Sequence, residues 1–123
     1  MTDQPANRLV WVEIPVSDMT RAKGFYQALL GEPLKDDNTG PNPMAILPYA
    51  GGAAAAGQLY PGKPAKNGEG ITAHLAVSGD LKSAMARVKD AGGDVVSDVV
   101  KIPAGSFFYA VDTEGNSIGI FEA

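Results

Sequence analysis

The most constraining feature of this 123-residue sequence is an internal repeat. The segment WVEIPVSDM, residues 11–19, aligns with TAHLAVSGDL, residues 72–81, at an offset of 61 with one extra glycine before the second helix. In each copy an alternating strand leads into an amphipathic helix, and shorter strands follow. A single copy has too little core to be stable alone. The repeat therefore predicts one domain in which two similar units share a hydrophobic core.

The repeat divides the chain into units at residues 8–60 and 70–122, joined by a Pro- and Gly-rich linker at residues 61–69. Each unit is predicted to be βαβββ, so the fold class is α+β, with mixed sheets around a shared concavity and the helices on the outer faces. The expected strands lie at residues 9–16, 32–36, 44–48 and 53–60 in the first unit, and at 71–77, 94–102, 106–111 and 117–122 in the second.

The first helix has clear end signals. Ser17 or Asp18 can cap its beginning, and Gly31 can end it, which places the helix at Met19 to Leu30. The second helix is predicted to begin at Leu81 and to end before Gly92 and Gly93.

Composition excludes several classes of function. The chain has no cysteine, which rules out disulfides, thiolate metal sites and thiol nucleophiles. Its net charge is −4 and its basic residues are scattered, so nucleic acid is not an expected partner. No apolar run is long enough to span a bilayer, and residues 1–8 lack the pattern of a secretory signal, so we expect no membrane association and a cytoplasmic location.

Three segments carry a family resemblance: EIPVSDMTRAKGFYQALLG after the first strand, AMARVKDAGGDVV in the second unit and AVDTEGNSIGIFE at the end. In this order and spacing, they resemble the vicinal-oxygen-chelate superfamily, which includes glyoxalase I, bleomycin-sequestering proteins and extradiol dioxygenases. The resemblance covers nearly the whole chain. It implies two βαβββ units around a cavity, and it implies a homodimer.

The enzymes of this family hold a divalent metal on side chains from the first and fourth strands of each unit. The corresponding positions fall on Trp11 and Thr72 for the first strands, on Gly119 for the last strand, and around Ala56 or Gly57 for the remaining one. None of these residues is a credible metal ligand. We therefore expect no metal ion and no other cofactor.

The candidate ligand-binding residues are those predicted to face the concavity: Trp11, Glu13, Gln58, Thr72, His74 and Ser117. The repeat places Glu13 and His74 at equivalent positions on the two first strands, so they could share a hydrogen bond and act as an acid–base pair. A lone histidine is more often structural than catalytic, and Trp11 is more often core than a stacking platform for a ligand.

The turn DTEGN, residues 112–116, resembles a binding motif, but the tight turn itself explains its residues. Glycine permits a left-handed backbone, and asparagine and aspartate bond to nearby amides. We therefore interpret Asp112, Gly115 and Asn116 as structural.

Three functions are compatible with these features. The first is a metal-free protein that binds a small, partly apolar molecule between the units. The second is an enzyme, a glyoxalase-related lyase or isomerase or a dioxygenase, that uses either a non-standard metal site or Glu13 and His74. The third is an interaction module whose concavity is filled by its own side chains. The sequence does not identify the ligand or the reaction.

Overall fold

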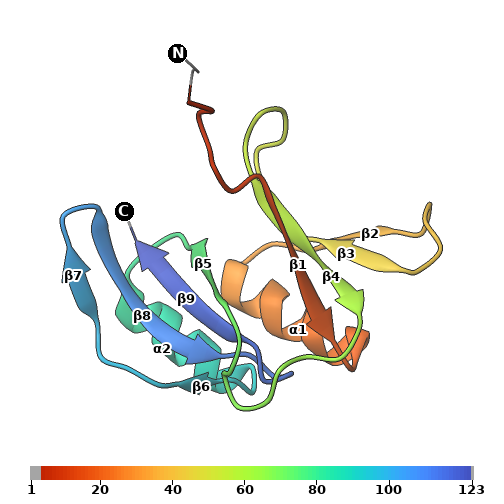
Figure 1. The fold of residues 1–123 in the computed structure, drawn as a ribbon. Helices are drawn as coiled ribbons and strands as arrows, with labels where there is room; N and C mark the ends of the chain where they lie inside the picture. Colours follow the sequence, from red (N-terminus) through yellow and green to blue (C-terminus); the bar gives the residue numbers. More distant parts are fainter. Residues whose placement is uncertain (1–3, 123) are drawn as a thin grey trace.

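The computed structural model describes residues 4–122. The first unit forms a four-stranded sheet in the order β1-β4-β3-β2, in which β1 and β4 are parallel and the other pairs are antiparallel (Figure 1). Its elements are β1 (Trp11–Val16), α1 (Met19–Leu30), β2 (Lys35–Asp37), β3 (Met44–Ile46) and β4 (Ala56–Pro61).

The second unit repeats this arrangement. Its sheet has the order β5-β9-β8-β6, with β5 and β9 parallel, and β7 pairs with β8 next to β6. Its elements are β5 (Thr72–Ala76), α2 (Leu81–Asp90), β6 (Asp94–Val95), β7 (Val100–Ile102), β8 (Gly105–Val111) and β9 (Ser117–Glu122). The predicted α+β class and the two related βαβββ units are confirmed.

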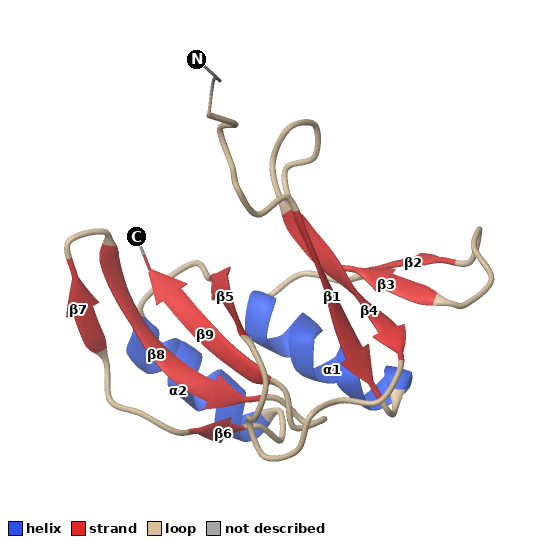
Figure 2. Ribbon diagram, viewed as in Figure 1, coloured by secondary structure: helices blue, strands red, loops and turns tan. Residues whose placement is uncertain are grey.

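The two helices lie on the same side of the molecule, each against the inner face of its own sheet (Figure 2). They pack on each other, and Arg87 Nε of α2 donates to the Leu29 carbonyl oxygen of α1 at 3.1 Å. Alternation along β1 buries Ile14 and Val16 toward the helices and turns Trp11 and Glu13 to the opposite face. The faces away from the helices are therefore left for ligand contact.

Helix α1 begins and ends where the sequence predicts. Asp18 caps it by accepting from the Arg21 amide at 3.0 Å, and Gly31 ends it with a φ of 74°, a left-handed conformation that glycine adopts without a steric cost. Its buried face consists of Ala22, Phe25, Tyr26 and Leu29. No helix within residues 4–122 is long and apolar enough to cross a membrane.

Some strand predictions were wrong. The single strand expected at residues 94–102 is two short strands, because Tyr109 N donates to the Ser97 hydroxyl at 2.9 Å instead of to a strand carbonyl. The strand expected from Ala53 begins only at Ala56, because the preceding alanines lie exposed and have little side chain with which to pack. The strand expected at 32–36 forms at Lys35–Asp37, since the Leu34 amide bonds to the Gln27 side chain.

Candidate functional site

A cavity of about 580 Å³ lies between the two units, where the edge of β1 faces the edge of β5. β1 pairs only with β4, and β5 pairs only with β9, so these edges are not hydrogen-bonded to each other. Most of the lining is apolar, and β5 adds two polar side chains, Thr72 and His74. The apolar side chains of the lining are Leu9, Val12, Leu30, Leu47, Pro48, Tyr49, Ala55, Ala56, Ala73, Leu75 and Ala76.

On the first unit, three of the predicted site residues form one polar chain. Trp11 Nε1 donates to Gln58 Oε1 at 3.4 Å, and Gln58 Nε2 donates to Glu13 Oε2 at 3.4 Å. Gln58 is buried and lies directly opposite Glu13 in the parallel pair of β1 and β4, whereas the Glu13 side chain is exposed. The ring of Tyr49, which lines the cavity, meets Trp11 edge to face at 5.6 Å. This arrangement presents a carboxylate and two aromatic rings.

On the second unit, His74 lies in a group of aromatic rings. Its ring centroid is 5.0 Å from that of Phe107, 5.8 Å from Tyr109 and 6.4 Å from Phe121. The imidazole fills the space above Gly119, where an added Cβ would lie 2.2 Å from Nδ1. Glycine at this position therefore gives His74 its place.

The hydrogen bond expected between Glu13 and His74 is not formed. Glu13 accepts from Gln58, and the neighbours of His74 are aromatic rings. The repeat predicted similar positions correctly, but the two edges belong to separate sheets, and each side chain finds partners within its own unit.

The remaining two predicted site residues contact each other. The hydroxyls of Thr72 and Ser117 are 2.5 Å apart, on paired positions of β5 and β9. Ser117 also lines a second, smaller cavity of about 50 Å³ together with Glu13 of the first unit. Val12 and Ala73 line both cavities, so the small one adjoins the large one.

The metal positions implied by the resemblance do not fit a metal ion. Trp11 lies opposite Ala56 as expected, but Gly119 lies opposite His74, whereas Thr72 lies opposite Ser117. His74 therefore takes the place assigned to Thr72, which leaves one imidazole beside a glycine. Within residues 4–122, no group of three or more His, Asp or Glu side chains is arranged to hold a metal.

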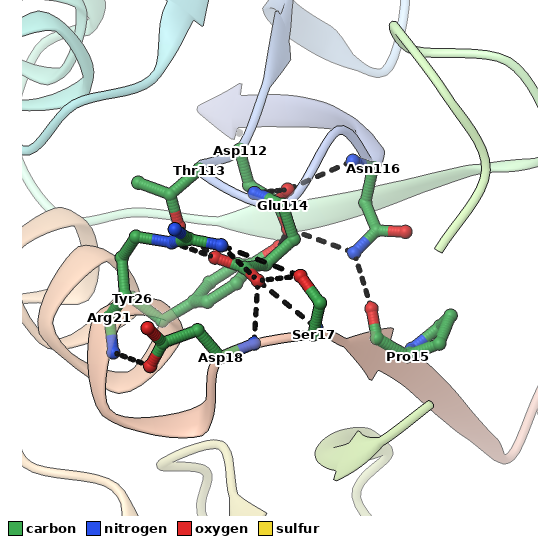
Figure 3. A network of polar contacts seen from close by, with 9 residues as sticks. All are labelled: Pro15, Ser17, Asp18, Arg21, Tyr26, Asp112, Thr113, Glu114 and Asn116. Carbon is green, nitrogen blue, oxygen red and sulfur yellow. Dashed lines mark hydrogen bonds and ion pairs between the residues drawn. The ribbon is translucent and has the colours of Figure 1, made fainter. Parts of the chain in front are cut away.

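A polar network that the sequence did not predict joins the units at the end of β1 (Figure 3). The Glu114 carboxylate, from the turn before β9, accepts from the amides and hydroxyl at the start of α1, and it pairs with Arg21 Nε at 2.7 Å. The Glu114 side chain is fully buried. These hydrogen bonds, that of Arg21 first, lower the pKa of Glu114 from 4.5 to about 2.

Asp112 extends the network on its other side. Its carboxylate accepts from the amides of Glu114 and Asn116, which closes the turn, and from the buried hydroxyl of Tyr26 in α1. Burial, together with the charge of Asp112, raises the pKa of Tyr26. Asn116 Nδ2 donates to the Pro15 carbonyl at 2.8 Å. We call Ser17, Arg21, Tyr26, Asp112, Glu114 and Asn116 the inter-unit clasp.

The structural interpretation of Asp112, Gly115 and Asn116 agrees with these contacts, since Gly115 has a φ of 97°. Glu114 was missed because an acidic residue in a polar turn normally faces water. A signal was present, because a carboxylate brought near the start of a helix is favoured there.

Comparison with solved structures gives similar folds at low sequence identity. A glyoxalase/bleomycin resistance protein from Albidiferax ferrireducens T118 is 22% identical with a TM-score of 0.70, covering 95% of this chain and 100% of the other. A fosfomycin resistance protein, FosX, from Listeria monocytogenes is 10% identical with a TM-score of 0.67, covering 98% of this chain and 93% of the other. No curated protein matches this sequence.

A family model covers nearly the whole chain. The Glyoxalase/Bleomycin resistance protein/Dioxygenase superfamily matches residues 8–120, which include both units and the linker. The match agrees with the repeat, the order of strands in both sheets and the similar structures. The chain belongs to the Glyoxalase/Bleomycin resistance protein/Dioxygenase superfamily.

Proposed function

We propose that this protein binds a small, partly apolar molecule in the cavity between its two units. The observation that supports this most directly is the cavity itself, about 580 Å³ with a mostly apolar lining. Small-molecule sites typically have this size and character, with a few polar groups that orient the ligand. Thr72, His74 and the Trp11–Gln58–Glu13 chain are the polar groups near it.

Binding needs no metal in this proposal. The residues at the ligand positions of the family do not supply a set of donors, and the separation of Glu13 from His74 gives no support to an acid–base pair. A filled concavity, as in an interaction module, is also disfavoured, because the space between β1 and β5 is open.

The experiment is a thermal-shift screen of small aromatic and heterocyclic compounds, followed by calorimetry of the hits. Ala55 lines the cavity, so Ala55→Phe should fill part of it and weaken binding of the hits at least about tenfold. Ala53 is exposed in the preceding turn outside the lining, so Ala53→Phe is the matched control and should bind as the parent does. Hits that bind equally well to Ala55→Phe would place binding elsewhere and contradict the proposal.

We also propose that the protein forms a homodimer. Four apolar side chains around the edge strand β7 are exposed: Val96, Val99, Val100 and Ile102. An unpaired edge with apolar side chains favours pairing with another chain. Light scattering after size exclusion should give twice the monomer mass, and Val100→Lys should lower it; a monomer at all concentrations would refute the dimer.

A further inference from the structure

We propose that the ligand of the inter-unit cavity is an organic cation that carries a flat apolar group. This inference rests on the proposed function and adds the charge and shape of the ligand. Three observations support it: the carboxylate of Glu13, the connection between the two cavities, and the aromatic rings on both sides.

The charge at the site is negative. Glu13 is exposed, and its hydrogen-bond partner Gln58 is neutral, so no cation offsets its charge in the structure. No lysine or arginine is present among the described residues that line either cavity. The two ion pairs of the described chain lie elsewhere, between Arg21 and Glu114 in the clasp and between Lys23 and Asp36. A positively charged ligand would gain from this carboxylate, and an anionic one would be repelled.

The two adjoining cavities separate the roles of the ligand's parts. The large cavity can take an apolar ring system, and the small one, at about 50 Å³, has room for only a few water-sized groups. Glu13 and Ser117 line the small cavity, so a carboxylate and a hydroxyl, both acceptors, face it. An ammonium or a small alkylated nitrogen matches these acceptors in size and charge.

Aromatic rings border the large cavity from both units. Tyr49 lines it from the first unit with Trp11 behind, and His74 lines it from the second with Phe107 and Tyr109 beside it. Aromatic rings favour flat apolar groups by stacking and attract organic cations by their negative faces. The rings and the carboxylate therefore select for the same class of molecule.

The test uses three probes that share a naphthalene ring and differ in charge: (naphthylmethyl)trimethylammonium, naphthylmethanol and naphthylacetate. Their dissociation constants are measured by calorimetry with the parent protein. The cation should bind about tenfold more tightly than the alcohol, and the anion should bind least tightly. Glu13→Gln should reduce the affinity for the cation to about that for the alcohol and leave the alcohol unchanged.

Glu32→Gln is the matched control, because it removes the same charge from an exposed loop position after α1. It should preserve the preference for the cation, and a similar loss in Glu32→Gln and Glu13→Gln would show that only the net charge matters and overturn the inference. Equal binding of all three probes, blocked by Ala55→Phe, would overturn the charge selection while supporting the proposed function. Failure of every probe, together with a failed compound screen, would refute both.

Discussion

The two junctions between the units differ in chemistry. At the end of β1 the inter-unit clasp is polar, and its buried carboxylates are satisfied by hydrogen bonds and an ion pair. Beside the beginning of β1 the edges of β1 and β5 leave a cavity with a mostly apolar lining. A directional polar contact fixes the geometry at one end, so the units need not collapse onto each other at the other end.

Glu114→Ala should have the largest effect on this contrast. It removes the acceptor of several hydrogen bonds from the start of α1 and the partner of Arg21, so the free energy of unfolding should fall by about 3 kcal/mol. Glu69→Ala, at an exposed position of the linker, should change it little. Urea denaturation measures both. Equal stabilities would mean that the clasp does not hold the units together.

The same carboxylate predicts a dependence on pH. Its pKa is lowered in the folded protein from 4.5 to about 2, so its contribution is fully present above pH 4.5 and is lost as the pH falls toward 2. The difference in unfolding free energy between the parent and Glu114→Ala should therefore narrow across this range. A constant difference from pH 5 to pH 2 would contradict the assignment.

Gly57→Ala should be the next largest change, and it acts within the first sheet. An added Cβ would lie 2.3 Å from the carbonyl oxygen of Val12, so β1 itself would have to move. We expect a loss of about 2 kcal/mol, measured by denaturation, and weaker binding in the cavity that Val12 lines. Parent-like stability would show that β1 can shift freely, which would weaken the idea of a fixed edge.

Tyr26→Phe tests the buried side of the clasp. It removes one hydrogen bond to Asp112, whose carboxylate keeps its bonds to Asn116 and to the turn. The expected loss of unfolding free energy is about 1 kcal/mol. Tyr60→Phe, on the half-buried end of β4, is the matched tyrosine and should be nearly neutral. A larger loss in Tyr60→Phe would reverse this assignment.

Gly119→Ala should have the smallest effect on stability, under about 1 kcal/mol, because the atoms in its way belong to the His74 ring and not to the backbone. The ring should turn out of its place among Phe107 and Tyr109. His74 is the single histidine, so its ring signals in proton NMR can be followed directly. Unchanged chemical shifts would contradict the packing described for this ring.

Much of the fold could be predicted because it depends on local patterns. The apolar spacing of α1, its Asp18 cap and its Gly31 end are encoded within one stretch, and the structure has the same bounds. The break between β6 and β7 was missed because it depends on a bond from Tyr109 to Ser97, twelve residues earlier. Of the candidate site, the outward-facing positions on β1 and β5 followed from alternation, but their partners did not.

The sequence by itself determined the two units, their helices and the class of residue that faces the concavity, because periodicity and turn chemistry act over a few neighbouring residues. Only the tertiary structure decided that Gln58 and not His74 contacts Glu13, that His74 lies over Gly119, and that Glu114 joins the units. These contacts connect residues 45 to 97 positions apart, and their geometry depends on strand register and on how the two sheets are placed.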